Sequence, residues 1–305
     1  MTITTAQSMN PIVFGEVLFD LFDDEEAVLG GAPFNVAWHL HGFGVKPLFI
    51  SRVGKDVRGQ QVITLMQQWG MRTDGIQFDK QHMTGTVCIR LNNGQPDYDI
   101  TGDVAYDHIQ NNSLHTLITN YGYGLLYHGS LVTRHPDSRH TLQQLRRETM
   151  YPVFIDINLR APWDDRQQAE SLLNGARWLK LNEEELEILT GTHYDNRNAL
   201  HKGAEKLLQQ YQLESLIVTL GNAGAFIISQ QGVFDTLSAA TEDLVDTVGA
   251  GDALSAVFIL GILHGWNQQL ALQRGVEFAS VICQQQGATS QDKGLYQRLL
   301  DKWME

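Results

Sequence analysis

The chain has 305 residues, of which 43% are hydrophobic and 19% charged, so it can bury a sizeable core and resembles ordinary globular proteins in composition. Its formal net charge of −13 argues against a broad basic surface for nucleic acid or an anionic membrane, although a few local donors can still hold a phosphate. With no visible signal peptide, no apolar run long enough to span a bilayer and no metal-ligand spacing between Cys88 and Cys283, a cytoplasmic protein without disulfides is expected.

Short β-rich runs alternate with helical patterns along most of the chain. Several of the runs are continuously apolar, as in strands buried on both faces, and strands are predicted at residues 12–14, 47–53, 124–129, 152–157, 177–181 and 216–220. Helices are predicted at residues 57–69, 136–148, 183–189, 198–211, 250–264 and 269–285. This alternation predicts an α/β fold with a mostly parallel sheet, whose ligands bind beyond the carboxyl ends of the strands.

Two segments interrupt the alternation. Residues 84–91 and 97–101 are predicted to form an antiparallel hairpin joined across Asn93-Gly94, a pair of residues typical of tight turns. Residues 18–28 are short, acidic and flanked by turns. We expect both segments to form one small accessory sheet. Because no linker, repeat or low-complexity tract divides the sequence, residues 1–305 are predicted to form a single domain.

The strongest functional signal is the string Asp-Thr-Val-Gly-Ala-Gly-Asp-Ala-Leu at residues 246–254. The turn of Gly249, Ala250 and Gly251 opens directly into an apolar helix, so its backbone N–H groups and the helix dipole can hold a phosphate or a developing oxyanion. Asp252 lies in the first helical turn, where its carboxylate can accept the proton that an alcohol loses during phosphoryl transfer. The alternative, a tight turn followed by a capping residue, is less favoured because several independent features coincide.

Other nucleotide-binding and metal-binding signatures are absent from the sequence. Gly54-Lys55 is followed by Asp56, where a P-loop requires Ser or Thr, and no Gly-x-Gly-x-x-Gly follows a predicted strand. The eleven histidines show no metal-ligand spacing. An ordinary P-loop or dinucleotide-binding protein is therefore excluded.

The chain resembles the ribokinase-like (PfkB) carbohydrate kinase family at both ends. Residues 246–254 resemble the C-terminal signature of the family, and residues 30–44, which begin Gly-Gly-Ala-Pro-Phe-Asn, resemble its N-terminal signature. Together with Gly-Glu-Val-Leu-Phe-Asp at residues 15–20, the N-terminal motif looks most similar to bacterial fructokinases. Glu16 departs from ribokinases, which usually have Asp there. The resemblance covers nearly the whole length of the chain.

The resemblance implies a three-layer αβα sandwich with a small β-sheet lid, formed by about residues 18–28 and 84–101. It implies that Asp252 deprotonates the sugar hydroxyl and that the backbone of residues 249–251 forms the anion hole. The residues that would hold the sugar are Asp20, Gly31, Asn35 and Arg160. Arg160 follows a predicted strand in an Asp-x-Asn-x-Arg motif and is equally compatible with an exposed surface position.

The same resemblance implies a nucleotide site and two cation sites. The residues matched to the nucleotide site are Asn182, Glu185, Thr219, Gly221 and Gly224. Glu185, at the end of an Asn-x-x-Glu motif, would organise Mg²⁺ through water, the alternative being a favourable charge at a helix start. Asp246 falls at the position of a monovalent-cation site that many members carry, with K⁺ as the expected ion.

These matches predict an ATP- and Mg²⁺-dependent kinase that phosphorylates a primary hydroxyl of a small sugar, with fructose favoured. Phe34, beside Asn35, is expected to pack its edge on the sugar ring. The alternatives are another sugar, a sugar acid such as 2-keto-3-deoxygluconate, or a nucleoside, and, in another class, a catalytically silent sugar-binding regulator. The expected partners are the sugar and ATP, without nucleic acid or membrane, and with a homodimer through the lid.

Overall fold

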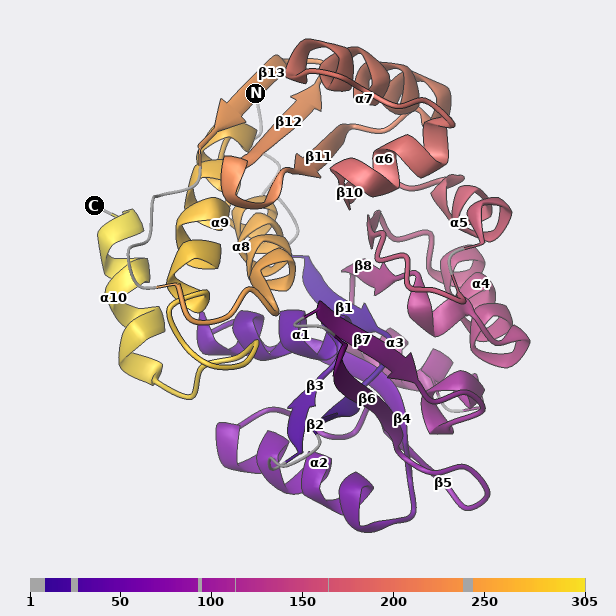
Figure 1. Ribbon diagram of the computed structural model, residues 1–305. Helices are drawn as coiled ribbons and strands as arrows, with labels where there is room; N and C mark the ends of the chain where they lie inside the picture. The colour runs from indigo at the N-terminus through magenta and orange to yellow at the C-terminus, as the bar shows by residue number, and fades with distance from the viewer. Residues whose placement is uncertain are drawn as a thin grey trace, which may run out of the picture.

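A nine-stranded, mostly parallel sheet forms the centre of the computed structural model, which describes residues 9–22, 27–92, 95–112, 114–163, 165–237 and 244–304. The strand order is β13-β12-β11-β10-β9-β8-β1-β4-β5 (Figure 1). The strands are β1 (Asn10–Phe14), β4 (Leu48–Gly54), β5 (Ile76–Asp79), β8 (Gly124–Gly129), β9 (Val153–Asp156), β10 (Trp178–Asn182), β11 (Ser215–Thr219), β12 (Ala225–Ser229) and β13 (Gly232–Thr236). The pairings of β11 with β12 and of β12 with β13 are antiparallel and the other pairings in this sheet are parallel, so the predicted α/β class is confirmed.

Helices cover both faces of this sheet and produce two hydrophobic cores. One core is shared with α1 (Ala32–Gly42), α2 (Val57–Trp69), α8 (Ala250–His264), α9 (Gln268–Ile282) and α10 (Lys293–Met304). The other is shared with α3 (Leu114–Tyr121), α4 (Pro136–Thr149), α5 (Arg166–Leu173), α6 (Glu183–Thr190) and α7 (Arg197–Tyr211). Strand side chains alternate between them: Phe154 of β9 joins the first core, and Ile155 joins the second. This arrangement is the predicted three-layer sandwich.

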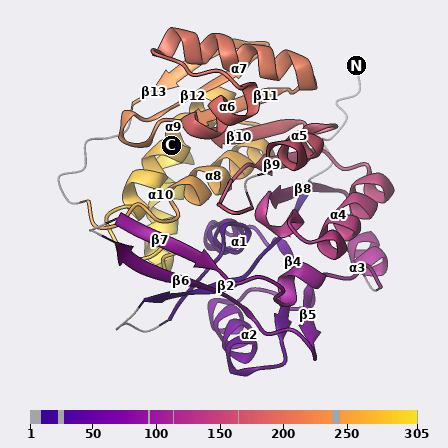
Figure 2. The same cartoon turned by 45° about the vertical axis from the view of Figure 1, so that its right-hand side comes forward.

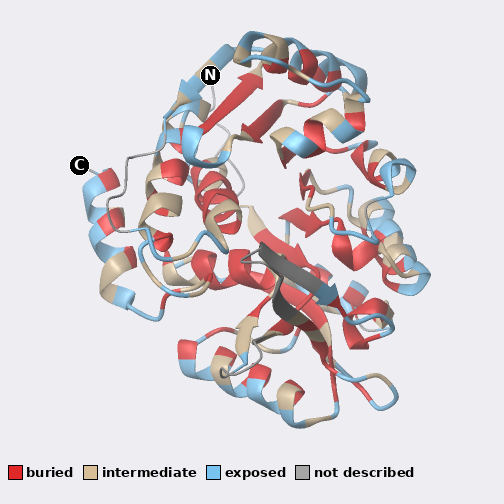
Figure 3. Ribbon diagram, viewed as in Figure 1, coloured by how far each residue is buried: buried red, intermediate tan, exposed pale blue. Residues whose placement is uncertain are grey.

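Helix α8 is buried along most of its length because it packs between the sheet and the helices α1 and α9 (Figure 3). Its sequence is apolar nearly all round, as expected of a helix without a solvent-facing stripe. The outer helices, such as α7, instead bury one side and expose the other. The N terminus of α8 is thereby held rigidly against the central sheet. Within the described residues, every helix is too short or too polar to cross a bilayer.

A second sheet of four strands, ordered β3-β2-β6-β7, projects from the central one (Figures 1 and 2). Its strands are β2 (Leu18–Phe22), β3 (Val28–Gly30), β6 (Gly85–Asn92) and β7 (Gln95–Ile100). Strands β6 and β7 form the predicted antiparallel hairpin, whose turn at residues 93–94 lies outside the described residues. Strand β2 pairs parallel with β6 and antiparallel with β3. The accessory sheet expected from residues 18–28 and 84–101 is present.

Several elements were not predicted. Strands β5, β12 and β13 and helices α1, α3, α5 and α10 are absent from the expected set, whereas the predicted elements end within three residues of those observed. Strand β12 follows a turn that ends at Gly224, where a φ of 91° favours glycine. The glycines of this turn indicated a loop, so the short apolar run after them was not predicted as a strand. Asp20, in the segment expected to join the small sheet, lies inside β2.

Candidate active site

A cavity of about 730 Å³ lies beyond the carboxyl ends of β9, β10 and β11, facing the N terminus of α8. Eleven of the fourteen predicted site residues line it: Asp20, Gly31, Asn35, Arg160, Asn182, Glu185, Thr219, Asp246, Gly249, Gly251 and Asp252. Ala250, Gly221 and Gly224 are not among its lining residues. Segments from both ends of the chain and from the small sheet therefore meet at one cavity, which is where ligands of such sheets bind.

The glycine-rich loop enters α8 through a backbone that only glycine adopts easily. Gly249 has φ 80°, and a Cβ there would lie 2.4 Å from the Cβ of Ala288. The Ala250 N–H donates to the carbonyl of Thr247 across 3.3 Å. The N–H groups of Gly251 and Asp252 have no hydrogen-bond acceptor among the described residues. They remain available to an anion at the positive end of the helix dipole.

Asp252 is buried at this helix end, with only 9% of its surface exposed. Burial, reinforced by the negative charge of Asp156, raises the pKa of Asp252 to about 6, and a hydrogen bond from Asn35 opposes the rise. In that bond the Asn35 Nδ2 donates to Asp252 Oδ2 across 2.8 Å. Asn35 thus orients one oxygen of the Asp252 carboxylate. A pKa near 6 suits a general base, which must be deprotonated near neutral pH and still able to accept a proton.

The sequence interpretation missed Lys180, which also lines the cavity. Its Nζ donates to Asp156 Oδ1 across 2.6 Å, and both side chains are almost fully buried. The signal in the sequence is a lysine inside the apolar run of β10, because a buried lysine nearly always has a partner. That partner lies 24 residues away and could not be identified before the strand pairing was known.

The end of the cavity beside the small sheet combines carboxyl groups with apolar side chains. Burial, with the charge of Asp246, raises the pKa of Asp20 to about 6. Glu16, a second pocket residue that was not predicted, is 3% exposed, and burial raises its pKa to about 7. Gly31 has φ 109°, and a Cβ there would lie 2.8 Å from the Glu16 carbonyl oxygen, so close backbone contact requires glycine. The apolar side chains here are Leu18, Val87, Ile100 and Leu131.

The predicted contact of Phe34 with the sugar ring is wrong. Phe34 is 1% exposed, does not line the cavity, and packs against the rings of Trp38 and Phe49 in the core. The physical reason is that α1 begins at Ala32, so consecutive residues point about 100° apart around the helix. Asn35 faces the cavity, and the residue before it faces the sheet.

Asn182 and Glu185 form a reciprocal cap at the start of α6. Asn182 Oδ1 accepts the Glu185 N–H, and Glu185 Oε2 accepts the Asn182 N–H, each across 2.8 Å. Glu185 Oε1 also accepts the N–H of Leu159 across 2.9 Å, which fastens the loop after β9. Burial raises the pKa of Glu185 to about 7. The contacts expected of a helix-start residue are therefore present, and Glu185 also lines the cavity.

Two other predicted residues lie in loops at the rim of the cavity. Arg160 is exposed, in the loop that Glu185 fastens. Asp246 joins two segments, because its Oδ1 accepts the Val248 N–H across 2.9 Å and its Oδ2 accepts the Gly287 N–H across 3.1 Å. Asp246 thereby holds the approach to the glycine-rich loop in place.

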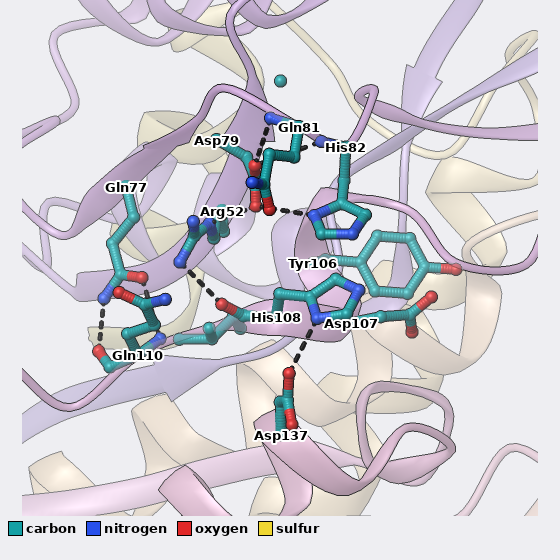
Figure 4. Close-up of polar contacts among 12 residues, drawn as sticks. Arg52, Gln77, Asp79, Gln81, His82, Tyr106, Asp107, His108, Gln110 and Asp137 are labelled. Atoms are coloured by element: carbon teal, nitrogen blue, oxygen red, sulfur yellow. Dashed lines mark hydrogen bonds and ion pairs between the residues drawn. The ribbon is translucent and has the colours of Figure 1, made fainter.

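A separate polar cluster surrounds η1 (Ala105–His108), although the histidines show no metal-ligand spacing along the sequence (Figure 4). His82, Asp103 and His108 place ligand atoms within 4.8 Å of one another, as do His108, His135 and Asp137. Sequence spacing missed the cluster because its members come from separate places in the chain: the loop at His82, the loop at Asp103, the end of η1 and the start of α4.

Within this cluster the imidazole of His108 is held between two carboxylates. His108 donates from Nδ1 to Asp137 across 2.8 Å and from Nε2 to Asp103 across 2.9 Å. Burial opposes the charge, but these two bonds outweigh it and raise the pKa of His108. The ring of His82 stacks on it at 3.7 Å, so the two rings cannot direct in-plane lone pairs at one ion. The cluster therefore joins the end of β7 to α4.

Comparison with known proteins agrees with the family that the two sequence motifs resemble. The family model described as pfkB family carbohydrate kinase matches residues 13–293. An uncharacterized sugar kinase from Pyrococcus horikoshii is 30% identical over 267 residues, covering 82% of this chain and 81% of the relative. A fructokinase from Salmonella typhimurium is 29% identical over 269 residues and covers 82% of each chain.

Solved structures share the fold over nearly the whole chain. The Pyrococcus horikoshii kinase in complex with ATP superposes with a TM-score of 0.77 and 26% identity, covering 96% of this chain and 99% of that one. A fructokinase variant from Vibrio cholerae, solved with fructose, ADP and a potassium ion, gives a TM-score of 0.78 at 22% identity, covering 97% of this chain and all of that one. At that identity the second likeness shows the fold alone.

Proposed function

The chain belongs to the pfkB family of carbohydrate kinases and is therefore a phosphotransferase that acts on a sugar hydroxyl; from that premise we propose that it transfers the γ-phosphate of ATP to a primary hydroxyl of fructose. One observation carries the proposal. The carboxylate of Asp252 and the free N–H groups at the start of α8 occupy the same wall of the cavity, between the small sheet and the ends of β10 and β11. A base beside an anion site is what transfer of a phosphoryl group to an alcohol requires.

A neutral sugar suits the cavity better than a sugar acid. Its end beside the small sheet has two carboxyl groups, Glu16 and Asp20, whose pKa values burial raises to about 7 and about 6, so both still carry negative charge at pH 7. Of the two cations that line the cavity, Lys180 is paired with Asp156, which leaves Arg160 as the cation that a substrate carboxylate could meet. A substrate carboxylate would meet like charge here, whereas sugar hydroxyls can donate to these oxygens. Relatives named fructokinases support fructose among the neutral sugars.

In this proposal Asp20, Gly31 and Asn35 hold the sugar, and Asn182, Glu185, Thr219, Gly221 and Gly224 form the nucleotide site, with Arg160 reaching the phosphates or the sugar. Because both oxygens of Glu185 already accept backbone N–H groups, Glu185 would act on ATP-bound Mg²⁺ through ordered water. Mg²⁺ would supply charge neutralisation for the phosphates when it is bound. Asp246, whose loop borders the glycine-rich turn, is the proposed ligand of a monovalent cation such as K⁺.

The acceptor is tested by measuring kcat/KM at saturating ATP·Mg²⁺ for fructose, ribose, glucose, 2-keto-3-deoxygluconate and adenosine. Fructose should give the highest value, because each buried polar group left without a hydroxyl partner costs about 1–3 kcal/mol, or roughly a five- to 150-fold loss. A tenfold advantage for any other compound would show that the sugar is wrong while the kinase assignment stands. Binding of sugar without any turnover of ATP would support a silent regulator instead.

We also propose that the small sheet is a lid over the sugar, and that a homodimer forms through it. Leu18 and Asp20 of β2, Val87 of β6 and Ile100 of β7 line the same cavity as Asp252. Closing segments of this kind exclude water from phosphoryl transfer.

Hydrogen exchange tests the lid directly. Exchange in β6 and β7 should slow several-fold when fructose binds, because closure protects the backbone, while the fully buried β8 should not change. The lid is rejected if β6 and β7 exchange at the same rate with and without a sugar that the protein is shown to bind.

A further inference from the structure

Lys180 stands in the middle of β10 with only 6% of its surface exposed. Its neighbours Leu179 and Leu181 are fully buried in the core shared with α5, α6 and α7. Side chains alternate along a strand, so Lys180 points to the opposite face, where Trp178 packs in the core shared with α8. A lysine at such a position loses most of its hydration and persists only with a strong partner.

Asp156 is that partner, and three hydrogen-bond donors converge on its carboxylate. The two residues lie opposite each other in the pairing of β9 and β10. Besides the lysine, Asp156 Oδ2 accepts the Tyr127 hydroxyl at 3.1 Å and the Ser255 hydroxyl at 2.7 Å. Burial works against the ammonium, but Asp156 outweighs it and raises the pKa of Lys180, so the side chain stays charged. The carboxylate therefore fixes a cation in the wall of the cavity.

The ammonium points at the glycine-rich turn. A Cβ placed on Gly251 would lie 3.1 Å from Lys180 Nζ, closer than two such atoms normally approach. The φ of Gly251 is not positive, so its backbone conformation does not require glycine. The missing side chain instead leaves room for the Lys180 ammonium. An ammonium has three donors, and among the described residues Asp156 is the one acceptor that Lys180 contacts. Two N–H donors of the Lys180 ammonium therefore remain available, close to the free backbone N–H groups of Gly251 and Asp252.

We propose that Lys180 is a further catalytic residue, which binds the γ-phosphoryl oxygens of the nucleotide during transfer; the inference rests on the proposed kinase function. The sugar oxygen forms the new bond to phosphorus as the bond to the ADP oxygen breaks, and the sugar proton passes to Asp252. Lys180 keeps its own protons and donates hydrogen bonds to the equatorial oxygens, where negative charge is spread in the transition state. Asp156 positions the ammonium, and the hydroxyls of Tyr127 and Ser255 position Asp156.

Lys180→Met tests this role because methionine keeps the length of the side chain and removes its charge. Removal of one preorganised donor to such an anion lowers kcat by about 10²–10³-fold, which is the expected loss. The second readout is the ratio of the dissociation constants for ADP·Mg²⁺ and for the nonhydrolysable analogue AMP-PNP·Mg²⁺, measured calorimetrically without sugar. The preference of the wild type for the γ-phosphate-bearing analogue should fall at least tenfold in the variant.

A purely structural role is separated by the double variant Asp156→Asn/Lys180→Met. The single variant leaves Asp156 buried without its counter-charge and is expected to melt at a lower temperature, whereas the double variant should recover Tm but neither kcat nor the γ-phosphate preference. The inference is overturned if kcat and the γ-phosphate preference of the double variant both return to within threefold of the Asp156→Asn single variant. It is also overturned if the preference is unchanged in Lys180→Met. A wild type that binds neither nucleotide would overturn the kinase function as well.

Discussion

Replacement of Asp252 by Asn is expected to lower kcat by at least about 10²–10⁴-fold, the usual contribution of a positioned general base. An amide keeps the size of the side chain and can still accept the hydrogen bond from Asn35, but it cannot take the sugar proton. The protein should remain folded. Because burial raises the pKa of Asp252 to about 6, above its unfolded value of 3.8, this carboxylate destabilises the folded state once pH rises through 6. The variant should therefore melt no earlier than the wild type at pH 7.

The pH profile gives an independent check on the same residue. The base must be deprotonated to act, so wild-type kcat/KM should fall as pH drops below about 6, following the raised pKa of Asp252. Asp195→Asn is the matched control, because it removes the same charge from a side chain that is 90% exposed, in the loop between α6 and α7. It should leave the pH profile unchanged. Asp252 is not the base if its variant keeps more than about a tenth of wild-type kcat.

Substitution of Gly249 by Ala should be the next most damaging change. The added Cβ would sit 2.4 Å from the Ala288 Cβ and 2.6 Å from its Cα, and the backbone φ of 80° is strained for any residue with a side chain. The loop must shift, and loss of one aligned donor from an anion site costs about 10²–10³-fold in kcat. We expect a loss of that size together with a Tm lowered by the roughly 1–3 kcal/mol that overpacking costs.

Gly265→Ala is a stringent control because it lies at the other end of the same helix. Gly265 caps α8 with φ 68°, and no atom lies within 4 Å of the point that an added Cβ would occupy. Both variants place a side chain on a left-handed backbone. Only Gly249→Ala adds a steric clash, and only Gly249 belongs to the proposed anion site. Gly265→Ala should lower Tm slightly and leave kcat unchanged. Equal kcat values in the two variants would show that the glycine-rich turn does not hold the phosphoryl group.

Local signals were sufficient for much of the fold and for the centre of the candidate site. Helices at residues 57–69 and 250–264 agree with the prediction at both ends, because local residues mark those ends: Asp56 and Gly70 for the first, Gly249 and Gly265 for the second. The glycine-rich string and Asp252 were recognisable for the same reason, since the loop, the helix end and the carboxylate occupy nine consecutive residues. The apolar runs of β8 to β11 were enough to predict a parallel sheet.

Tertiary structure decided the features that depend on partners far apart in the chain. Lys180 and Asp156 become an ion pair only because β9 and β10 are neighbours in register, and Glu185 reaches Leu159 across the same sheet edge. Phe34 turned to the core because the start of α1, which no local cap revealed, sets the direction of every side chain after it. The sequence alone thus determined which chemistry the chain carries. Strand order and helix phase decided which side chains meet, because those depend on the packing of the whole chain.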